Sequence, residues 1–175
     1  MTTSELIVFL PLVGAILGAV VGGVVGAYAN SRARDREVKK MQDQERRGLL
    51  LLVGSEVQHN TRLLTVISAG KPSAIIQNLQ TIVWDETQIR LSSLLNFAYL
   101  EEITNYYALV KVHQTSPIAR KAKTEDMTAS ERQGIESMMV LAMAIMRKAQ
   151  DYIGDSDFAA SVDQLEQLVY RRSKG

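Results

Sequence analysis

The chain has 175 residues, of which 46% are hydrophobic and 22% are charged. Lys and Arg number 20 and Asp and Glu number 19, so the formal net charge is only +1. This balance gives no support for a nucleic-acid-binding protein, because such proteins carry a clustered basic excess. The absence of cysteine excludes disulfides, thiolate zinc sites and a cysteine nucleophile, and it fits a reducing compartment.

The first long segment is entirely uncharged. Residues 6–29 read LIVFLPLVGAILGAVVGGVVGAYA. As a helix this segment would be about 36 Å long, enough to cross a hydrocarbon core of about 30 Å with some tilt. We therefore predict a single transmembrane helix over residues 1–30. The rest of the chain is long enough for one folded domain.

Glycine recurs at every fourth position of this segment, at Gly14, Gly18, Gly22 and Gly26. Residues four apart lie on one face of a helix, and small residues there let two helices approach closely in lipid. The pattern predicts a packing face for a second copy or for another membrane protein. The alternative is that glycine is simply more frequent in membrane helices than in soluble ones.

The flanking charges predict the orientation of the segment. Glu5 is the only charged residue before it, whereas five basic residues follow closely: Arg32, Arg34, Arg36, Lys39 and Lys40. The positive-inside rule then places the N-terminus outside and the C-terminal domain in the cytoplasm. The same five residues are predicted to contact anionic lipid headgroups. A cleaved signal peptide is disfavoured, because no basic residue precedes the apolar run and the run is too long.

Residues 31–48 are predicted to continue the helix as a basic juxtamembrane stalk. From residue 49 the sequence LLLLVGSEVQHNTRLLTVI contains four consecutive leucines, which we expect to be buried on more than one side because they cannot share one stripe. Gly70 and Pro72 should end this helix. Glu56 and Asn60 are four residues apart and so share a face. They are predicted to form a polar core pair, either as hydrogen-bonded structural groups or as a feature that fixes register or receives a partner.

The middle of the chain is predicted to contain two helices. Residues 73–84 favour a short helix that caps the distal end of a bundle, with an interfacial membrane helix as the alternative. Asp85 is the expected N-cap of a longer helix over 86–114. If that helix runs antiparallel to the first, the loop at 115–127 returns toward the bilayer, where its basic side chains would meet lipid. Those side chains are Arg120, Lys121 and Lys123.

The last third of the chain has the clearest helical pattern. Thr128 and Glu131 have the spacing of a capping box, and apolar residues follow at helical spacing up to Ile153. Gly154 should end this helix, and Ser156 or Asp157 should start a final one that precedes a basic tail at 172–175. We therefore predict an all-α protein with a cytoplasmic antiparallel bundle of about four helices over 49–171.

No pattern typical of catalysis or cofactor binding is present. His59 and His113 are the only histidines, and neither lies in an H-E-x-x-H or E-x-x-H sequence. Phosphate-binding loops and nucleophile elbows are absent as well. Four methionines crowd one helix, where the spacing favours core packing over Cu(I) or partner binding: Met138, Met139, Met143 and Met146. We expect neither a metal, nor a cofactor, nor an enzyme.

Three stretches of the chain carry a resemblance: LLLLVGSEVQHNTRLL at 49–64, the lone Trp84, and LEEITNYYALV at 100–110. With the glycine-rich start and the basic stalk, the chain resembles small bacterial single-pass membrane proteins of uncharacterised function. The resemblance implies a location in the inner membrane with a helical cytoplasmic domain. It brings no catalytic residue.

The leading hypothesis is a non-enzymatic membrane-anchored scaffold, or an accessory subunit, that acts through helix–helix association. A pore-forming or membrane-perturbing effector is the first alternative, because glycine-faced helices can pack into rings. A ligand-sensing membrane protein is the second, with Tyr106, Tyr107 and the methionine-rich helix as its candidate binding surface.

Overall fold

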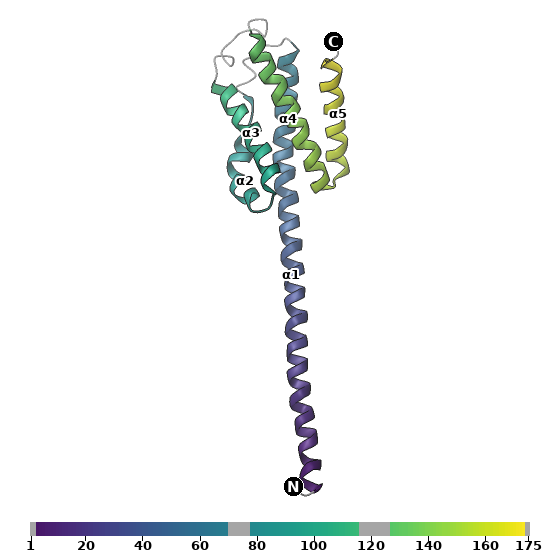
Figure 1. The fold of residues 1–175 in the computed structure, drawn as a ribbon. Helices are drawn as coiled ribbons and strands as arrows, with labels where there is room; N and C mark the ends of the chain where they lie inside the picture. The colour runs from purple at the N-terminus through teal and green to yellow at the C-terminus, as the bar shows by residue number, and fades with distance from the viewer. Residues whose placement is uncertain (1–2, 70–77, 116–126, 174–175) are drawn as a thin grey trace. The chain divides into compact units, whose positions relative to one another are not determined.

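The computed structural model describes the backbone of residues 3–69, 78–115 and 127–173, and the side chains of 21–69, 78–115 and 127–170. Within these residues the chain is all-α, as predicted, with five helices and no strand (Figure 1). The helices are α1 (Thr3–Ser68), α2 (Ile82–Ser92), α3 (Phe97–Thr115), α4 (Ala129–Ile153) and α5 (Ser156–Ser173). The chain divides into two compact units, Met1–Asp43 and Gln44–Gly175.

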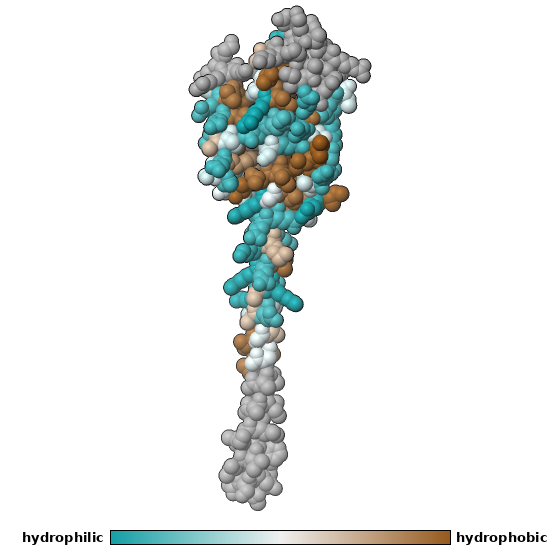
Figure 2. Space-filling model, turned by 180° about the vertical axis from the view of Figure 1, so that it is seen from behind, coloured by the Kyte–Doolittle hydropathy of each residue, from teal (hydrophilic) through white to brown (hydrophobic). Residues whose placement is uncertain are grey.

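The first unit consists of the N-terminal part of α1. All of its side chains from residue 21 onward are exposed. They are mainly hydrophobic at the start of this stretch and mainly hydrophilic further along (Figure 2). Within the described residues, no helix is long and apolar enough to cross a membrane. Most of the predicted span, residues 6–20, lies outside the residues whose side chains are described.

The second unit packs α2, α3, α4 and α5 with the C-terminal part of α1. In Figure 1, α4 runs opposite to α3 and to α5, so these neighbours are antiparallel as predicted. The predicted core stripe of α4 is buried, because its apolar residues repeat at helical spacing on the side that faces the other helices. The buried residues of α4 are Ile135, Met138, Met139, Ala142, Ile145, Met146, Ala149 and Ile153.

The predicted single helix over 86–114 is wrong, because the chain turns between α2 and α3. The Ser92 and Ser93 hydroxyls donate to the carbonyls of Ile89 and Arg90 at 2.6 and 2.8 Å. Serine side chains that bond to nearby backbone compete with helix continuation. Asn96 then starts α3, since its Oδ1 accepts the Tyr99 amide at 2.9 Å in the manner of an N-cap.

The start of α2 also differs from prediction. The helix begins at Ile82 with Thr81 in the N-cap position, so Asp85 lies in the first turn. The Thr81 hydroxyl donates to the Asp85 carboxylate at 3.0 Å. Trp84 therefore belongs to α2, whereas residues 79–81 are not helical. The remainder of the predicted cap helix, over 73–77, lies outside the described residues.

Because α2 runs in the direction opposite to α1, the next helix, α3, runs in the same direction as α1 (Figure 1). Gln114 near the end of α3 donates to the Leu79 carbonyl at 2.5 Å, and the neighbouring Gln80 is bonded to Asn60 of α1. The two ends of the loop at 115–127 therefore lie at the end of the unit where α1 finishes, far from Gln44. The antiparallel arrangement of α1 and α3, on which the expected return of this loop toward the bilayer depends, is not found (Figure 1). The loop itself lies outside the described residues.

The predicted burial of the four consecutive leucines is found for only two of them. Leu49 and Leu50 are in the core, whereas Leu51 is 40% exposed and Leu52 is 52% exposed. α1 contacts α2 through Glu56 and Val83, α4 through Arg46 and Tyr152, and α5 through Gly54 and Phe158. Leu51 and Leu52 lie on the side of α1 that faces solvent. Figure 2 shows hydrophobic side chains gathered in a band across one face of the bundle.

Two local predictions in the last third are confirmed, and one is shifted by one residue. Thr128 and Glu131 form a reciprocal capping box at the start of α4. Gly154 ends that helix in the left-handed conformation, with φ 63°, which glycine adopts without a Cβ penalty. The cap of α5 is Asp155, whose Oδ1 accepts the amides of Asp157 and Phe158 at 2.9 Å each.

Candidate functional site

The predicted polar pair holds the start of α2 against α1. Glu56 is 3% exposed, and its carboxylate accepts the Val83 amide at 2.8 Å and the Trp84 amide at 3.3 Å. The first amides of a helix have no partner within the helix. Thr81, in the N-cap position, makes no capping bond with its side chain. Glu56 therefore supplies, from another helix, the cap that α2 lacks locally, and its charge is favoured by the helix dipole.

Asn60 continues this arrangement one turn along α1. Its side chain is fully buried; its Nδ2 donates to the Gln80 carbonyl at 2.8 Å and its Oδ1 accepts the Gln80 amide at 2.7 Å. The amide thus pairs with both polar groups of one backbone residue. Together, Glu56 and Asn60 satisfy three backbone amides and one carbonyl between residues 80 and 84. Both side chains of the pair are therefore hydrogen-bonded to the backbone that leads into α2.

Three aromatic side chains cover the pair from α2 and α3. Trp84 stacks on Tyr107 with ring centroids 5.1 Å apart, and Tyr107 meets Tyr106 edge-on, also at 5.1 Å. The two phenol hydroxyls are buried without a hydrogen bond of good geometry, although Asn60 and Glu56 lie close enough to affect them. Burial raises the pKa of both tyrosines, and the Glu56 charge raises them further. They therefore stay neutral, which rules them out as bases at ordinary pH.

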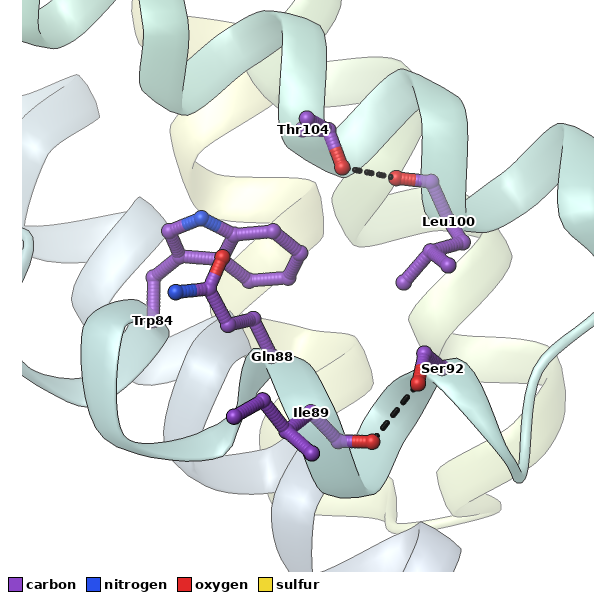
Figure 3. A pocket seen from close by; sticks show the side chains of 6 residues that line it. All are labelled: Trp84, Gln88, Ile89, Ser92, Leu100 and Thr104. Atoms are coloured by element: carbon purple, nitrogen blue, oxygen red, sulfur yellow. Dashed lines mark hydrogen bonds between the residues drawn. The ribbon is translucent and has the colours of Figure 1, made fainter.

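A shallow groove of about 260 Å³ lies on the outer side of this cluster, between α2 and α3 (Figure 3). Its lining residues are Trp84, Gln88, Ile89, Ser92, Leu100 and Thr104. The Thr104 and Ser92 hydroxyls donate to carbonyls of their own helices, those of Leu100 and Ile89. The groove thus presents mainly apolar surface with no charged or nucleophilic group aimed into it, which suits packing rather than a reaction.

The predicted packing face lies in the first unit. Nothing lies within 4 Å of a Cβ built at Gly22 or Gly26, so this side of the helix is open. Gly14 and Gly18 fall among the residues whose side chains are outside the description. The structure thus leaves the described half of the face available to another helix.

The predicted headgroup contacts are exposed along the same unit. All five basic side chains, from Arg32 to Lys40, point to solvent. The Arg32 guanidinium lies 4.7 Å from the centre of the Tyr28 ring. Arginine over a tyrosine ring is a favourable cation–π contact, and this one joins the end of the apolar stretch to the start of the basic one.

The two histidines lie apart. His59 is exposed on α1, whereas His113 is 9% exposed near the end of α3. The His113 Nδ1 is 2.9 Å from the Leu109 carbonyl, and its ring lies against the backbone of Gly134 in α4. Among the described residues, no group of three His, Asp or Glu side chains could hold a metal ion.

No protein-family model matches the chain, and no curated protein or solved structure resembles it significantly. The functional argument therefore depends on the molecule's own surfaces. The buried pair fixes the position of α2, the groove is apolar and shallow, and the first unit carries the exposed apolar and basic surfaces.

Proposed function

We propose that the protein is a non-enzymatic scaffold or accessory subunit, anchored in the inner membrane by residues 1–30 and acting through helix–helix association. The N-terminus would lie outside, and the helical bundle would lie in the cytoplasm. The proposal is supported by the lack of assembled site chemistry among the described residues and by the exposed surface of the first unit.

The exposed apolar stretch of α1 carries the proposal. Val21, Val24, Val25 and Tyr28 are each between 59% and 65% exposed, and the residues between them are Gly or Ala. Soluble proteins rarely leave such a continuous apolar surface in water. A lipid bilayer or another apolar helix must therefore cover it, and the uncharged sequence continues backward to Leu6.

The glycine face supports self-association or association with another membrane helix. In lipid, apolar side chains gain little by leaving one apolar environment for another, so close backbone packing becomes the main attraction between helices. Gly22 and Gly26 leave the helix surface open. Two such surfaces can approach more closely than surfaces covered by valine.

The test replaces Gly22 and Gly26 with Leu in the full chain and measures association in membranes by crosslinking and by recovery of co-purifying proteins. Neither substitution meets an atom of its own chain within 4 Å of the new Cβ, so a loss of association must come from a contact with another molecule. Val24→Phe, which adds bulk on roughly the opposite side, is the control and should leave association unchanged.

Association that persists in the Gly22→Leu/Gly26→Leu chain would contradict the proposed packing face. Ion leakage through membranes that contain the wild-type chain, lost in the same double variant, would replace the scaffold with the pore-forming alternative.

A further inference from the structure

The basic residues of the first unit are not spread evenly around the helix. Successive residues of an α-helix turn by about 100°. Arg32, Arg36, Lys39 and Lys40 therefore fall within a sector of about 100°, whereas Arg34 lies on roughly the opposite side. All five side chains are exposed. We call the first four residues the basic face.

Few acidic groups oppose these charges. Asp35 and Glu37 lie about 40° and about 60° outside this sector, and no ion pair among the described residues joins either of them to the four cations. Asp43, at the end of the unit, falls within the sector, so the basic face carries four cations against one carboxylate. The basic face therefore keeps a clear excess of positive charge that is free to meet an external anion.

The contact between Tyr28 and Arg32 marks where the basic face begins. The guanidinium lies 4.7 Å from the ring centroid. Tyrosine is enriched at the level of lipid headgroups, where its ring faces the apolar region and its hydroxyl faces water. If Tyr28 lies at that level, the first cation of the basic face lies one turn beyond it, at the lipid phosphates.

Lys40, at the far end of the basic face, comes near the lipid phosphates only if the helix tilts. Lys40 is about 18 Å beyond Tyr28 along the axis, and electrostatic attraction is screened over about 8 Å at physiological salt. Transmembrane helices tilt by about 20° on average. A tilt toward the basic face, with the long side chains extended to the surface, lowers its four cations toward the lipid phosphates and raises Arg34.

We propose that the basic face binds the anionic headgroups of phospholipids in the cytoplasmic leaflet and tilts the helix toward them. The proposal rests on the proposed function, because it needs residues 6–29 to cross the bilayer. It adds the chemistry of a partner, phosphate-bearing anionic lipid, and it separates four of the predicted headgroup contacts from the fifth.

The test uses the full chain reconstituted in phosphatidylcholine bilayers with trace spin-labelled phosphatidylglycerol or phosphatidylcholine, and it measures the preference for the anionic lipid. Arg36→Gln and Arg34→Gln are a matched pair, since each removes one arginine and the positions are two residues apart. Each near-surface cation should contribute a factor of about five. We expect Arg36→Gln to lower the preference for phosphatidylglycerol by about that factor and Arg34→Gln to lower it by less.

Replacing all four residues of the basic face with Gln should bring the ratio of phosphatidylglycerol binding to phosphatidylcholine binding close to one. Gln is a good helix former, and Trp84 fluorescence checks that the bundle of each variant is intact. Equal effects of Arg36→Gln and Arg34→Gln would overturn the one-sided face. A preference retained by the fourfold variant would overturn lipid binding. Retention of RNA at physiological salt, without preference for anionic lipid, would assign the face to nucleic acid instead.

The two proposals fail in different ways. A wild-type chain that resists alkaline extraction but shows no preference for phosphatidylglycerol contradicts lipid recognition alone. A chain that alkali removes from the membrane contradicts the anchor, and therefore the proposed function as well.

Discussion

The carboxylate of Glu56 accepts the backbone amide of Val83 at 2.8 Å, so a side chain of α1 caps a helix that begins more than twenty residues later. This contact is tertiary and buried, and it fixes the position of α2 against α1. α2 in turn reverses the chain so that α3 can run alongside α1. The direction of α3 depends on this reversal.

Glu56→Ala should destabilise the bundle by about 2 kcal/mol, because the buried amides of Val83 and Trp84 lose their acceptor. Glu56→Gln should cost less, since its amide oxygen can still accept one of the two bonds. The measurement is urea unfolding of the full chain in mild detergent, followed through Trp84, the only tryptophan.

Glu86→Ala is the control for this prediction, because Glu86 is an exposed residue of the same α2. Its substitution should change the free energy of unfolding by no more than about 0.5 kcal/mol. If Glu56→Ala proved as mild as Glu86→Ala, the capping role of Glu56 would have to be abandoned.

Gly54→Ala should destabilise the contact between α1 and α5. A Cβ at Gly54 would lie 2.7 Å from the Phe158 ring, which is itself buried. The ring must shift in a packed core, at a cost of about 1–3 kcal/mol, which exceeds the gain of up to about 1 kcal/mol from removing a helical glycine. Thermal unfolding of the full chain in detergent should therefore show a lower midpoint.

Gly48→Ala makes the same chemical change six residues earlier, where nothing lies within 4 Å of the new Cβ. It should stabilise the chain by about 0.5–1 kcal/mol through helix propensity alone. The two substitutions are thus expected to have opposite signs. A stabilising effect of Gly54→Ala would show that Phe158 does not pack against Gly54 in solution.

The bundle should unfold cooperatively in alkali. Burial is the main cause that raises the pKa of Tyr99, Tyr106 and Tyr107 above the ordinary value of 10.0. Because the folded state keeps these phenols protonated, their contribution to stability is complete below pH 10 and is lost as the pH rises above it. Each tyrosine lowers the free energy of unfolding by about 1.4 kcal/mol per pH unit in that range.

The measurement is tyrosinate absorbance against pH, recorded alongside Trp84 fluorescence. We expect the three buried tyrosines to ionise in one steep step that coincides with loss of the folded signal. Gradual ionisation near pH 10, with the fluorescence unchanged, would show that these hydroxyls are accessible to solvent.

The sequence predicts best what is decided locally. The capping box at Thr128 and Glu131, the repeated apolar positions of α4, and the left-handed Gly154 are all short-range signals, and all three are found in the structure. These features depend on the backbone within one or two turns, so their neighbours in sequence are also their neighbours in space.

Features that depend on distant parts of the chain were missed. The break at 93–96 has a local signal that could have revealed it, the pair of serines followed by Asn96, but the apolar pattern continues through it. The residue Glu56 can be recognised as part of a polar pair, but its capping role has no such signal, because its partners are amides 27 and 28 residues away. Leu51 and Leu52 look like core residues in sequence, and only the arrangement of the other helices shows that their side of α1 is left uncovered.

The anchor and its direction are tested most directly by single-cysteine labelling, for which the cysteine-free chain is well suited. One full-length variant carries Thr3→Cys and another carries Val140→Cys, an exposed position on α4. In right-side-out membrane vesicles, a membrane-impermeant maleimide should label position 3 at once and position 140 only after permeabilisation, with both chains resistant to alkaline extraction. Immediate labelling at position 140, or release of the chain by alkali, would contradict a membrane-anchored protein with a cytoplasmic bundle.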